Sequence, residues 1–238
     1  MVEQQTKIKE AAGRAAVDAL VKSGMKLGLG TGSTAIHAIR RVGQLLALGS
    51  LKDVSAFVTS FYSEIECEKL GIPCYSLNSK ELSGTLDLTI DGADEVDPDN
   101  CLIKGGGGAL LSEKIAAYAS ASYAIAVGES KIVDNLGTSF PLPVEVIPEA
   151  RVTTSKALEK LGAAVELREA LRKAGPIITE HGNLILDIRF TAPVDPAVME
   201  RKINQIPGVV ENGFFTCNKP VVYIAHADGT IEVRKAPS

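Results

Sequence analysis

The sequence predicts an α/β protein with a parallel sheet, followed by a smaller α+β domain. Short apolar segments alternate with amphipathic ones over residues 1–137, and strands that alternate with helices pair in parallel, with helices on both faces of the sheet. After Phe140-Pro141-Leu142-Pro143 the order changes to strand–helix–strand–strand–helix–strand, as in ferredoxin-like units. Hydrophobic residues make up 45% of the chain but aromatic residues only 5%, so the core must consist of Ala, Val, Leu and Ile.

The first domain begins with a predicted helix, because apolar residues from Ile8 to Leu20 recur at helical spacing. Gly24 ends this helix. Apolar segments then predict five strands, at residues 25–30, 54–58, 73–77, 86–90 and 123–127. The predicted helices between them cover residues 36–46, 64–70 and 109–119.

The second domain follows the changed order. Its predicted strands lie at residues 144–147, 164–167 and 209–214, its helices at 152–161 and 196–205, and its hairpin turns at His181-Gly182-Asn183. The last apolar segment, residues 221–225, is placed back in the first sheet. The predicted large domain therefore comprises residues 1–137 and 215–238, and the predicted small domain comprises residues 138–214.

Composition excludes several classes of protein. A net charge of −4 argues against a nucleic-acid partner, which needs a basic face. The four cysteines form no CxxC pair, which indicates reduced intracellular thiols without a zinc knuckle. There is no signal-peptide core, and no apolar run approaches the roughly 20 residues of a membrane span. We expect a cytoplasmic protein, or an organellar one if a transit peptide has been removed.

A glycine-rich turn, Gly30-Thr31-Gly32-Ser33-Thr34-Ala35, follows the first strand. It fits the G-x-G-x-x-G/A dinucleotide fingerprint, but the second strand ends in Thr59-Ser60-Phe61 rather than in the acidic residue that holds the ribose hydroxyls. A Walker A loop is excluded because no Gly-Lys-Ser/Thr follows. Converging backbone amides at a helix start favour a phosphate. The alternative is a tight turn with an ordinary Ser/Thr N-cap.

Two carboxylates, Asp91 and Asp94, follow the strand at residues 86–90. Ligands of parallel sheets bind beyond the carboxyl ends of the strands, so these residues belong beside the glycine turn. A magnesium site and an acidic surface turn are both compatible with the pair. The three histidines are isolated and offer no metal-ligand spacing.

The run Lys104-Gly105-Gly106-Gly107-Gly108 precedes a helix that carries Glu113 near its start. Successive glycines destabilise a chain and indicate backbone that approaches a ligand, although a flexible loop would also contain them. Glu113 alone is compatible with a carboxylate that merely favours the helix dipole. Together these residues provide a general base, a cation and backbone donors, the chemistry of proton abstraction beside a carbonyl.

These motifs, in this order, resemble the A-type ribose-5-phosphate isomerases. Glu113-Lys114, Ser130-Lys131, the segment 140–148 and the segment 204–210 extend the resemblance over nearly the whole chain. One departure is Phe61-Tyr62-Ser63-Glu64, where the family has a polar stretch. The resemblance implies a Rossmann-like large domain with a small α+β domain, and interconversion of D-ribose 5-phosphate and D-ribulose 5-phosphate in the pentose phosphate pathway. It also implies no metal, no cofactor, and a homodimer or homotetramer.

The resemblance further implies a role for each matched residue. Glu113 would carry the proton between C2 and C1, Lys104 and Asp94 would hold O1 and O2 of an enediolate, and Asp91 would assist opening of the furanose ring. Ser33 and Thr34 would bind the phosphate with backbone amides, and Lys131 would fix the substrate. Lys9 resembles a further phosphate lysine, although Lys7 is close to it in sequence. Further substrate contacts are expected from Thr31, Gly32, Gly92, Ala93, Gly105, Gly106 and Gly107.

Two other functions are compatible with such a fold. A sugar-phosphate-sensing module would have a helix-turn-helix domain and a degraded base position, but Glu113 is present and the chain starts directly with the large domain. An amino-sugar phosphate deaminase or a CoA transferase would not need the run of four glycines or the pair Asp91/Asp94. The sequence therefore favours the isomerase.

Overall fold

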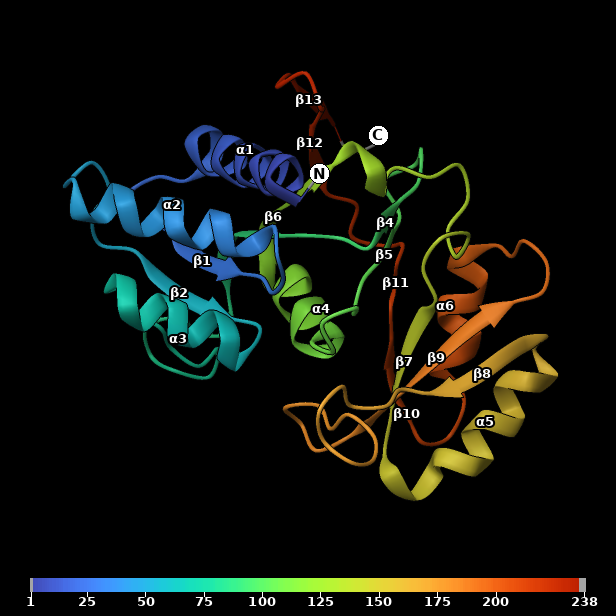
Figure 1. The fold of residues 1–238 in the computed structure, drawn as a ribbon. Helices are drawn as coiled ribbons and strands as arrows, with labels where there is room; N and C mark the ends of the chain where they lie inside the picture. The colour runs from blue at the N-terminus through green and yellow to red at the C-terminus, as the bar shows by residue number, and fades with distance from the viewer. Residues whose placement is uncertain (1, 236–238) are drawn as a thin grey trace. The chain divides into compact units, whose positions relative to one another are not determined.

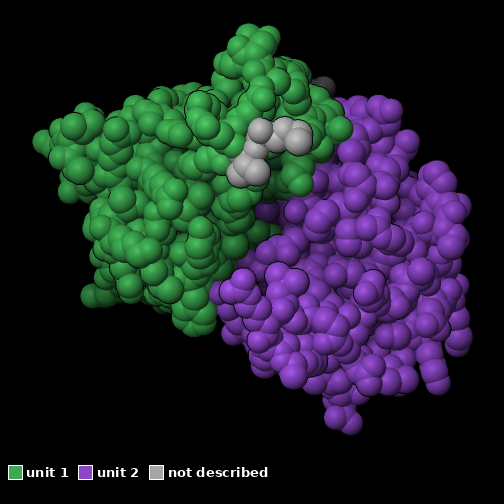
Figure 2. Space-filling model, in the orientation of Figure 1, with its two compact units in different colours: residues 1–93, 112–132, 218–238 green, residues 94–111, 133–217 purple. Residues whose placement is uncertain are grey.

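The structure, a computed structural model, describes residues 2–235 (Figure 1). The chain forms two compact units, which Figure 2 distinguishes by colour. Unit 1 comprises residues 1–93, 112–132 and 218–238, and unit 2 comprises residues 94–111 and 133–217. Among the described helices, none is long and apolar enough to cross a membrane.

Unit 1 contains a six-stranded sheet in the order β13-β12-β6-β3-β1-β2. All its neighbouring strands are parallel except β13, which runs antiparallel to β12. The predicted parallel sheet is confirmed, and so is the return of residues 221–225 to it. The strands are β1 (Lys26–Leu29), β2 (Ser55–Val58), β3 (Leu86–Asp91), β6 (Ser120–Gly128), β12 (Val221–Ala225) and β13 (Ile231–Arg234).

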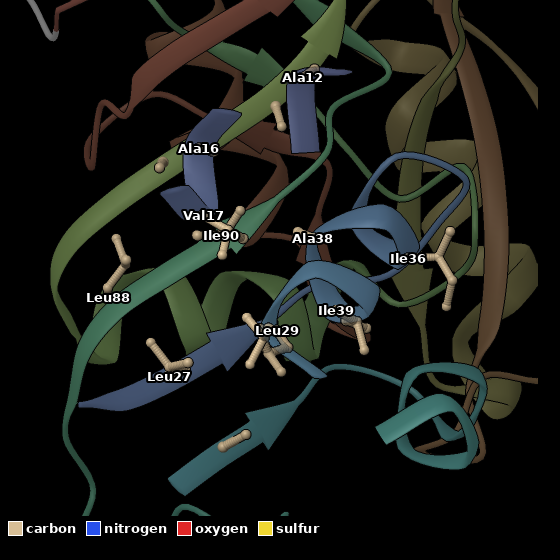
Figure 3. Close-up of a cluster of buried hydrophobic side chains, with 14 of the residues drawn as sticks. Ala12, Ala16, Val17, Leu27, Leu29, Ile36, Ala38, Ile39, Leu88 and Ile90 are labelled. Atoms are coloured by element: carbon tan, nitrogen blue, oxygen red, sulfur yellow. The ribbon is translucent and has the colours of Figure 1, made fainter. Parts of the chain in front are cut away.

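Helices cover both faces of this sheet. The helices α1 (Val2–Leu20), α2 (Ala35–Ala47) and α3 (Phe61–Leu70) share one apolar core with the side chains of Leu27, Leu29, Leu88 and Ile90, as Figure 3 shows for α1 and α2. On the opposite face, α4 (Leu110–Ala119) packs Ala116 against Leu86 and Leu82. Because side chains alternate along a strand, Thr89 points away from the first core and donates a hydrogen bond to Ala116 O of α4, at 3.2 Å.

One predicted strand of unit 1 is wrong. Residues 73–77 form only an isolated parallel bridge, between Ala56 and Cys74. Two hydrogen bonds make this bridge, from Ala56 N to Pro73 O and from Tyr75 N to Ala56 O. Pro73 has no N–H to extend the pairing, and the chain turns directly afterwards, where Ser79 N donates to Ser76 O.

Unit 2 contains the predicted ferredoxin-like order. Its four-stranded sheet is antiparallel throughout, in the order β10-β7-β9-β8. The elements are β7 (Leu142–Val146), the short helix η2 (Pro148–Ala150), α5 (Arg151–Lys160), β8 (Ala163–Leu167), β9 (Leu184–Phe190), α6 (Pro196–Asn204) and β10 (Val209–Asn212).

A second, three-stranded sheet in unit 2 was not predicted. The segment expected as one strand at residues 209–214 divides at Gly213 into β10 and β11 (Phe214–Phe215), and β11 pairs with β5 (Leu102–Ile103), which pairs with β4 (Glu95–Val96). These two-residue strands are too short for a periodic pattern. Their pairing places residues 94–111 in unit 2, whereas the domain prediction assigns them to the large domain. That division into functional domains stays a prediction.

A substitution at Gly28 of β1 tests the packing between the sheet and α4. A Cβ at this position would lie 1.9 Å from Thr89 Oγ1, the atom that bonds α4. We expect Gly28→Ala to lower the free energy of unfolding in urea by about 1–3 kcal/mol, because Thr89 must leave its position. The control is the same substitution in a Thr89→Ala background, where the loss should be smaller. Equal losses in both backgrounds would contradict this account.

Candidate active site

The glycine-rich turn joins the carboxyl end of β1 to α2. Gly30 N donates to Ile90 O at 3.0 Å, which continues the pairing with β3, and Gly32 has a φ of +116°, in the region that favours glycine. Thr34 precedes α2, but its side chain makes no capping hydrogen bond, so an ordinary N-cap does not explain it. Ser33 is exposed. The turn therefore presents two hydroxyls at a helix start that favours an anion.

Hydroxyl groups from the end of β2 and the start of α3 hold this turn. Thr31 Oγ1 lies 2.6 Å from Thr59 Oγ1 and donates to Ser60 Oγ at 2.7 Å. Ser63 Oγ donates to Gly30 O at 2.7 Å, and Ser63 N donates to Ser60 Oγ, which caps α3. Sequence reasoning noted Thr59-Ser60-Phe61 only as the absence of an acidic residue. The Ser at an N-cap position was the available signal for this support.

Asp91, at the end of β3, is fully buried against the turn. Its Oδ1 accepts hydrogen bonds from Thr31 N at 3.1 Å and from Gly92 N at 2.7 Å. A Cβ at Gly30 would lie 1.9 Å from the same oxygen, and a Cβ at Gly92 would lie 3.8 Å from Thr34 Cβ. The structure therefore brings together Asp91, Gly92 and the turn at residues 30–34, as predicted.

Glu113 lies on the buried side of α4, with 3% of its surface exposed. Its position along the sheet follows from two contacts, since Ser120 pairs with Leu86 and Ala116 O accepts from Thr89. The helix α4 therefore runs antiparallel to β3, so residues earlier in α4 lie beside residues later in β3. Glu113 precedes Ala116 by three residues, about 4.5 Å along the helix, and Asp91 follows Thr89 by two, about 6.6 Å along the strand. Both carboxylates therefore point to the same edge and face of the sheet.

Two lysines of unit 1 belong to the predicted set. Lys131 lies in the short helix η1 (Glu129–Lys131), directly after the carboxyl end of β6. Glu129 of the same turn accepts a hydrogen bond from His226 Nδ1 at 2.8 Å when that nitrogen carries a proton, and this contact raises the pKa of His226. Lys131 is thus held at the edge where β1 and β3 also end.

Lys9 lies on α1, half-buried, while Lys7 is exposed and forms an ion pair with Glu3. Burial lowers the pKa of His37 on α2, and the nearby charge of Lys9 acts in the same direction. Lys9 therefore lies near the helix that follows the glycine turn, whereas Lys7 is paired with Glu3 at the surface.

Asp94 begins unit 2 and contacts the glycine run of that unit. Its Oδ2 accepts from Gly106 N at 2.8 Å, and a Cβ at Gly106 would lie 2.6 Å from its Oδ1. Gly105 has a φ of +108°, and a side chain there would come within 2.9 Å of Leu110 Cβ. The run therefore forms a turn whose backbone donates a hydrogen bond to the Asp94 carboxylate.

Lys104 is buried in unit 2, with 2% of its surface exposed. Its backbone N donates to Gly213 O at 2.9 Å, and its ammonium lies 5.7 Å from the ring centroid of Phe215, within cation–π range. The three-stranded sheet of unit 2 thus positions Lys104, since β11 carries Phe215 and β5 ends directly before Lys104. The sequence predicts Lys104 as a site residue but does not predict these two contacts.

Glu95 is fully buried and organises the turn at residues 137–140. One of its oxygens accepts hydrogen bonds from Ser139 N, Ser139 Oγ and Phe140 N at 2.6–2.7 Å, and the other accepts from Gly137 N. A Cβ at Gly106 would lie 3.0 Å from the Phe140 ring. Glu95 therefore fixes the backbone of Phe140, whose ring borders the glycine run. No local pattern in the sequence predicts this role of Glu95.

The described residues contain no group of three or more His, Cys, Asp or Glu side chains that could hold a metal ion. Within unit 1 the structure brings together Asp91, Gly92 and the glycine turn, and within unit 2 it brings together Asp94 and the glycine run. Ala93 links the two aspartates as the last residue of unit 1, and Gly107 is exposed.

Comparisons with known proteins point to one family. The family model of ribose 5-phosphate isomerase A (phosphoriboisomerase A) matches residues 55–229. Ribose-5-phosphate isomerase A of Treponema denticola is 53% identical over 234 residues, which cover 95% of this chain and 98% of that protein. The structure of ribose 5-phosphate isomerase A from Methanocaldococcus jannaschii has a TM-score of 0.89 at 40% identity, covering 96% and 98% of the chains.

A further similar structure is a D-ribose-5-phosphate isomerase in complex with phospho-erythronic acid. Its TM-score is 0.90 at 36% identity, with 96% of this chain and 97% of that chain covered.

The Glu95 contacts generate a stability prediction. Glu95→Gln replaces one of the two carboxylate oxygens by an NH2 donor, so the partly buried donors that face this atom lose their acceptor. We expect the free energy of unfolding in urea to fall by about 1–3 kcal/mol. Glu159→Gln, an exposed substitution on α5 of the same unit, is the matched control and should change stability little. Equal effects of the two substitutions would contradict the assigned role.

Proposed function

The chain belongs to the ribose 5-phosphate isomerase A family, and on that premise we propose which residues carry the reaction. It is an aldose–ketose isomerase that interconverts D-ribose 5-phosphate and D-ribulose 5-phosphate in the pentose phosphate pathway. The reaction moves one proton between two adjacent carbons and one between two oxygens. Such a reaction needs a base near the carbons and groups that stabilise the charge developing on the oxygens.

We propose Glu113 as the base that carries the proton between C2 and C1 through an enediolate. The observation that carries this proposal is its placement on α4, which directs it to the same face and edge of the unit 1 sheet as Asp91 and the glycine turn. The Glu113 side chain is almost fully buried, so its carboxylate is held in place by the surrounding protein. A proton that this base takes from carbon can exchange with solvent before it returns, so solvent hydrogen can enter the product at C1.

The oxyanion groups proposed for this reaction are Lys104 and Asp94, which hold O1 and O2. The ammonium group of Lys104 is held in one position, because it is buried against the ring of Phe215. Asp94 already accepts the Gly106 N–H, so its orientation is set before substrate arrives. Gly105, Gly106 and Gly107 supply backbone close to these side chains. A preorganised charge requires little rearrangement at the moment of reaction.

Asp91 is proposed to assist opening of the furanose ring, because the reactive aldehyde exists only in the open-chain form. Its Oδ1 is committed to Thr31 N and Gly92 N, which leaves proton transfer to its Oδ2. Because Thr31 belongs to the turn proposed to bind phosphate, the same hydrogen bonds fix Asp91 relative to the bound phosphate. Gly92 and Ala93 contribute backbone contacts to the substrate in this proposal.

The phosphate is proposed to bind at the turn of residues 31–34. Ser33 and Thr34 donate their hydroxyls, Thr31 and Gly32 contribute backbone, and the start of α2 provides the favourable dipole. Lys131 fixes the substrate from the end of β6. Lys9 rather than Lys7 is the additional phosphate lysine, since Lys7 is turned to solvent and paired with Glu3.

We also propose that the chain acts in the cytoplasm without metal or cofactor, as a homodimer or homotetramer. The family resemblance supports this assembly, and α3 exposes the apolar side chains of Phe61, Tyr62 and Ile65, which a second copy could cover. Light scattering on the purified protein measures the assembly directly.

Replacement of the base tests the central role. We expect Glu113→Gln to lower kcat by about 100- to 10,000-fold, with KM little changed, because the base acts only in the chemical step. Steady-state kinetics with ribose 5-phosphate measures both. Glu159→Gln is the control and should retain full activity. Activity retained by Glu113→Gln would move the base to Asp91 or Asp94.

The fate of the proton tests the mechanism without a mutation. Protein freed of metal with EDTA and incubated with ribose 5-phosphate in deuterated water should remain active and place solvent deuterium at C1 of the ketose. Proton NMR of the product measures this incorporation. Loss of turnover in EDTA that a divalent metal restores would contradict the metal-free mechanism.

A further inference from the structure

Arg168, which directly follows β8 in unit 2, is held rigidly although no role has been given to it. It forms a two-pronged ion pair with Asp187 of β9, with 2.7 Å between Nε and Oδ2 and 2.5 Å between Nη2 and Oδ1. The two side chains are only 14% and 18% exposed. Such a fork fixes the plane of the guanidinium as well as its position.

The remaining nitrogen of Arg168 contacts the glycine run. Nη1 donates to Gly105 O at 2.9 Å and to Gly106 O at 3.2 Å. These carbonyls lie 63 and 62 residues away in sequence from Arg168. The contact therefore joins the four-stranded sheet of unit 2 to the backbone beside Lys104.

One peptide group of the run is held at both ends. Gly105 O and Gly106 N belong to the same planar trans peptide, so they point in opposite directions. Arg168 donates to the oxygen, while Asp94 accepts from the nitrogen at 2.8 Å. The orientation of this plane thus sets where the Asp94 carboxylate lies.

The next peptide group follows the same rule. Gly106 O accepts from Arg168, so the N–H of Gly107 must point away from Arg168. A glycine run without side chains has many accessible backbone conformations. Arg168 selects the one that directs the amide of Gly106 toward Asp94 and turns the amide of Gly107 away from Arg168.

We propose that Arg168, oriented by Asp187, is a positioning residue that fixes the glycine run and, through it, Asp94 for stabilisation of the enediolate. The inference rests on the proposed role of Asp94. In this role Arg168 acts through the glycine run and needs no contact with the substrate. Arginine is required because a lysine has no planar fork and cannot pair with Asp187 and donate to two carbonyls in one geometry.

The expected effect is on the chemical step. Misplacement of a catalytic group by about 1 Å can lower a rate about 100-fold, so we expect Arg168→Ala to lower kcat by about 10- to 100-fold. Arg168→Lys should not rescue kcat, and Asp187→Asn should lower it by a smaller factor. Arg189→Ala is the matched control, because Arg189 is an exposed arginine on the same strand as Asp187.

Two ligands separate positioning from general damage. Phospho-erythronate carries a carboxylate whose oxygens stand in for those of the enediolate, whereas inorganic phosphate reports only on the phosphate site. Competitive inhibition should show weakened binding of phospho-erythronate to Arg168→Ala by a factor close to that in kcat, with binding of phosphate unchanged. Added guanidinium, well below unfolding concentrations, should restore part of the activity of Arg168→Ala and none to Asp187→Asn.

The outcomes distinguish this inference from the proposed function, with Asp94→Asn assayed in parallel. If Asp94→Asn lowers kcat but Arg168→Ala and Arg168→Lys do not, the positioning role is wrong and the role of Asp94 stands. If Asp94→Asn retains full activity, the proposed function of Asp94 fails and the inference with it. If Arg168→Ala does not fold, Arg168→Lys and Asp187→Asn provide the test. In these variants the binding of phospho-erythronate should weaken while the binding of phosphate stays unchanged. Equal weakening of both ligands would overturn the positioning role.

Discussion

The face of the unit 1 sheet that meets α4 is the constraint on which the proposed chemistry depends. On this face Gly28 of β1 and Gly30, which directly follows β1, lie beside Thr89 and Asp91 of β3. A Cβ at either glycine would lie 1.9 Å from an oxygen of its neighbour on β3. Because these two glycines have no side chain, Thr89 can reach α4 and Asp91 can reach the glycine turn. The position of Glu113 depends on the first contact, and the position of the phosphate turn depends on the second.

The opposite face of the same sheet has a different task. There Leu27, Leu29, Leu88 and Ile90 pack with α1 and α2 in one apolar core (Figure 3). Alternation of side chains along each strand separates the two tasks residue by residue. Substitutions on the two faces should therefore act differently, one set through stability alone and the other through the placement of reacting groups.

Much of the fold followed from periodicity, and less of the site did. The alternation of helices and strands predicted the parallel sheet, and the changed order after Pro143 predicted the ferredoxin-like unit. The strand at residues 73–77 failed because hydrophobicity does not show that Pro73 limits pairing to one bridge. Strands β4 and β5 are too short to show a period. Motifs predict Glu113, Asp91, Asp94 and Lys104 as site residues, whereas Arg168 and Glu95 make contacts 42–63 residues distant in sequence, which no local pattern reveals.

The sequence predicts that the clustered glycines let the backbone approach a ligand. For two of them, the structure shows that contacts within the protein already require a glycine. A Cβ at Gly30 would collide with the Asp91 carboxylate, and a Cβ at Gly106 would lie 2.6 Å from the Asp94 carboxylate. In each case the missing side chain admits a carboxylate of the protein itself, which then binds an amide of the same turn. Two aspartates three residues apart are thus each tied to a glycine turn in their own unit. Because a tied carboxylate loses little further freedom when substrate binds, the glycines serve preorganisation rather than flexibility.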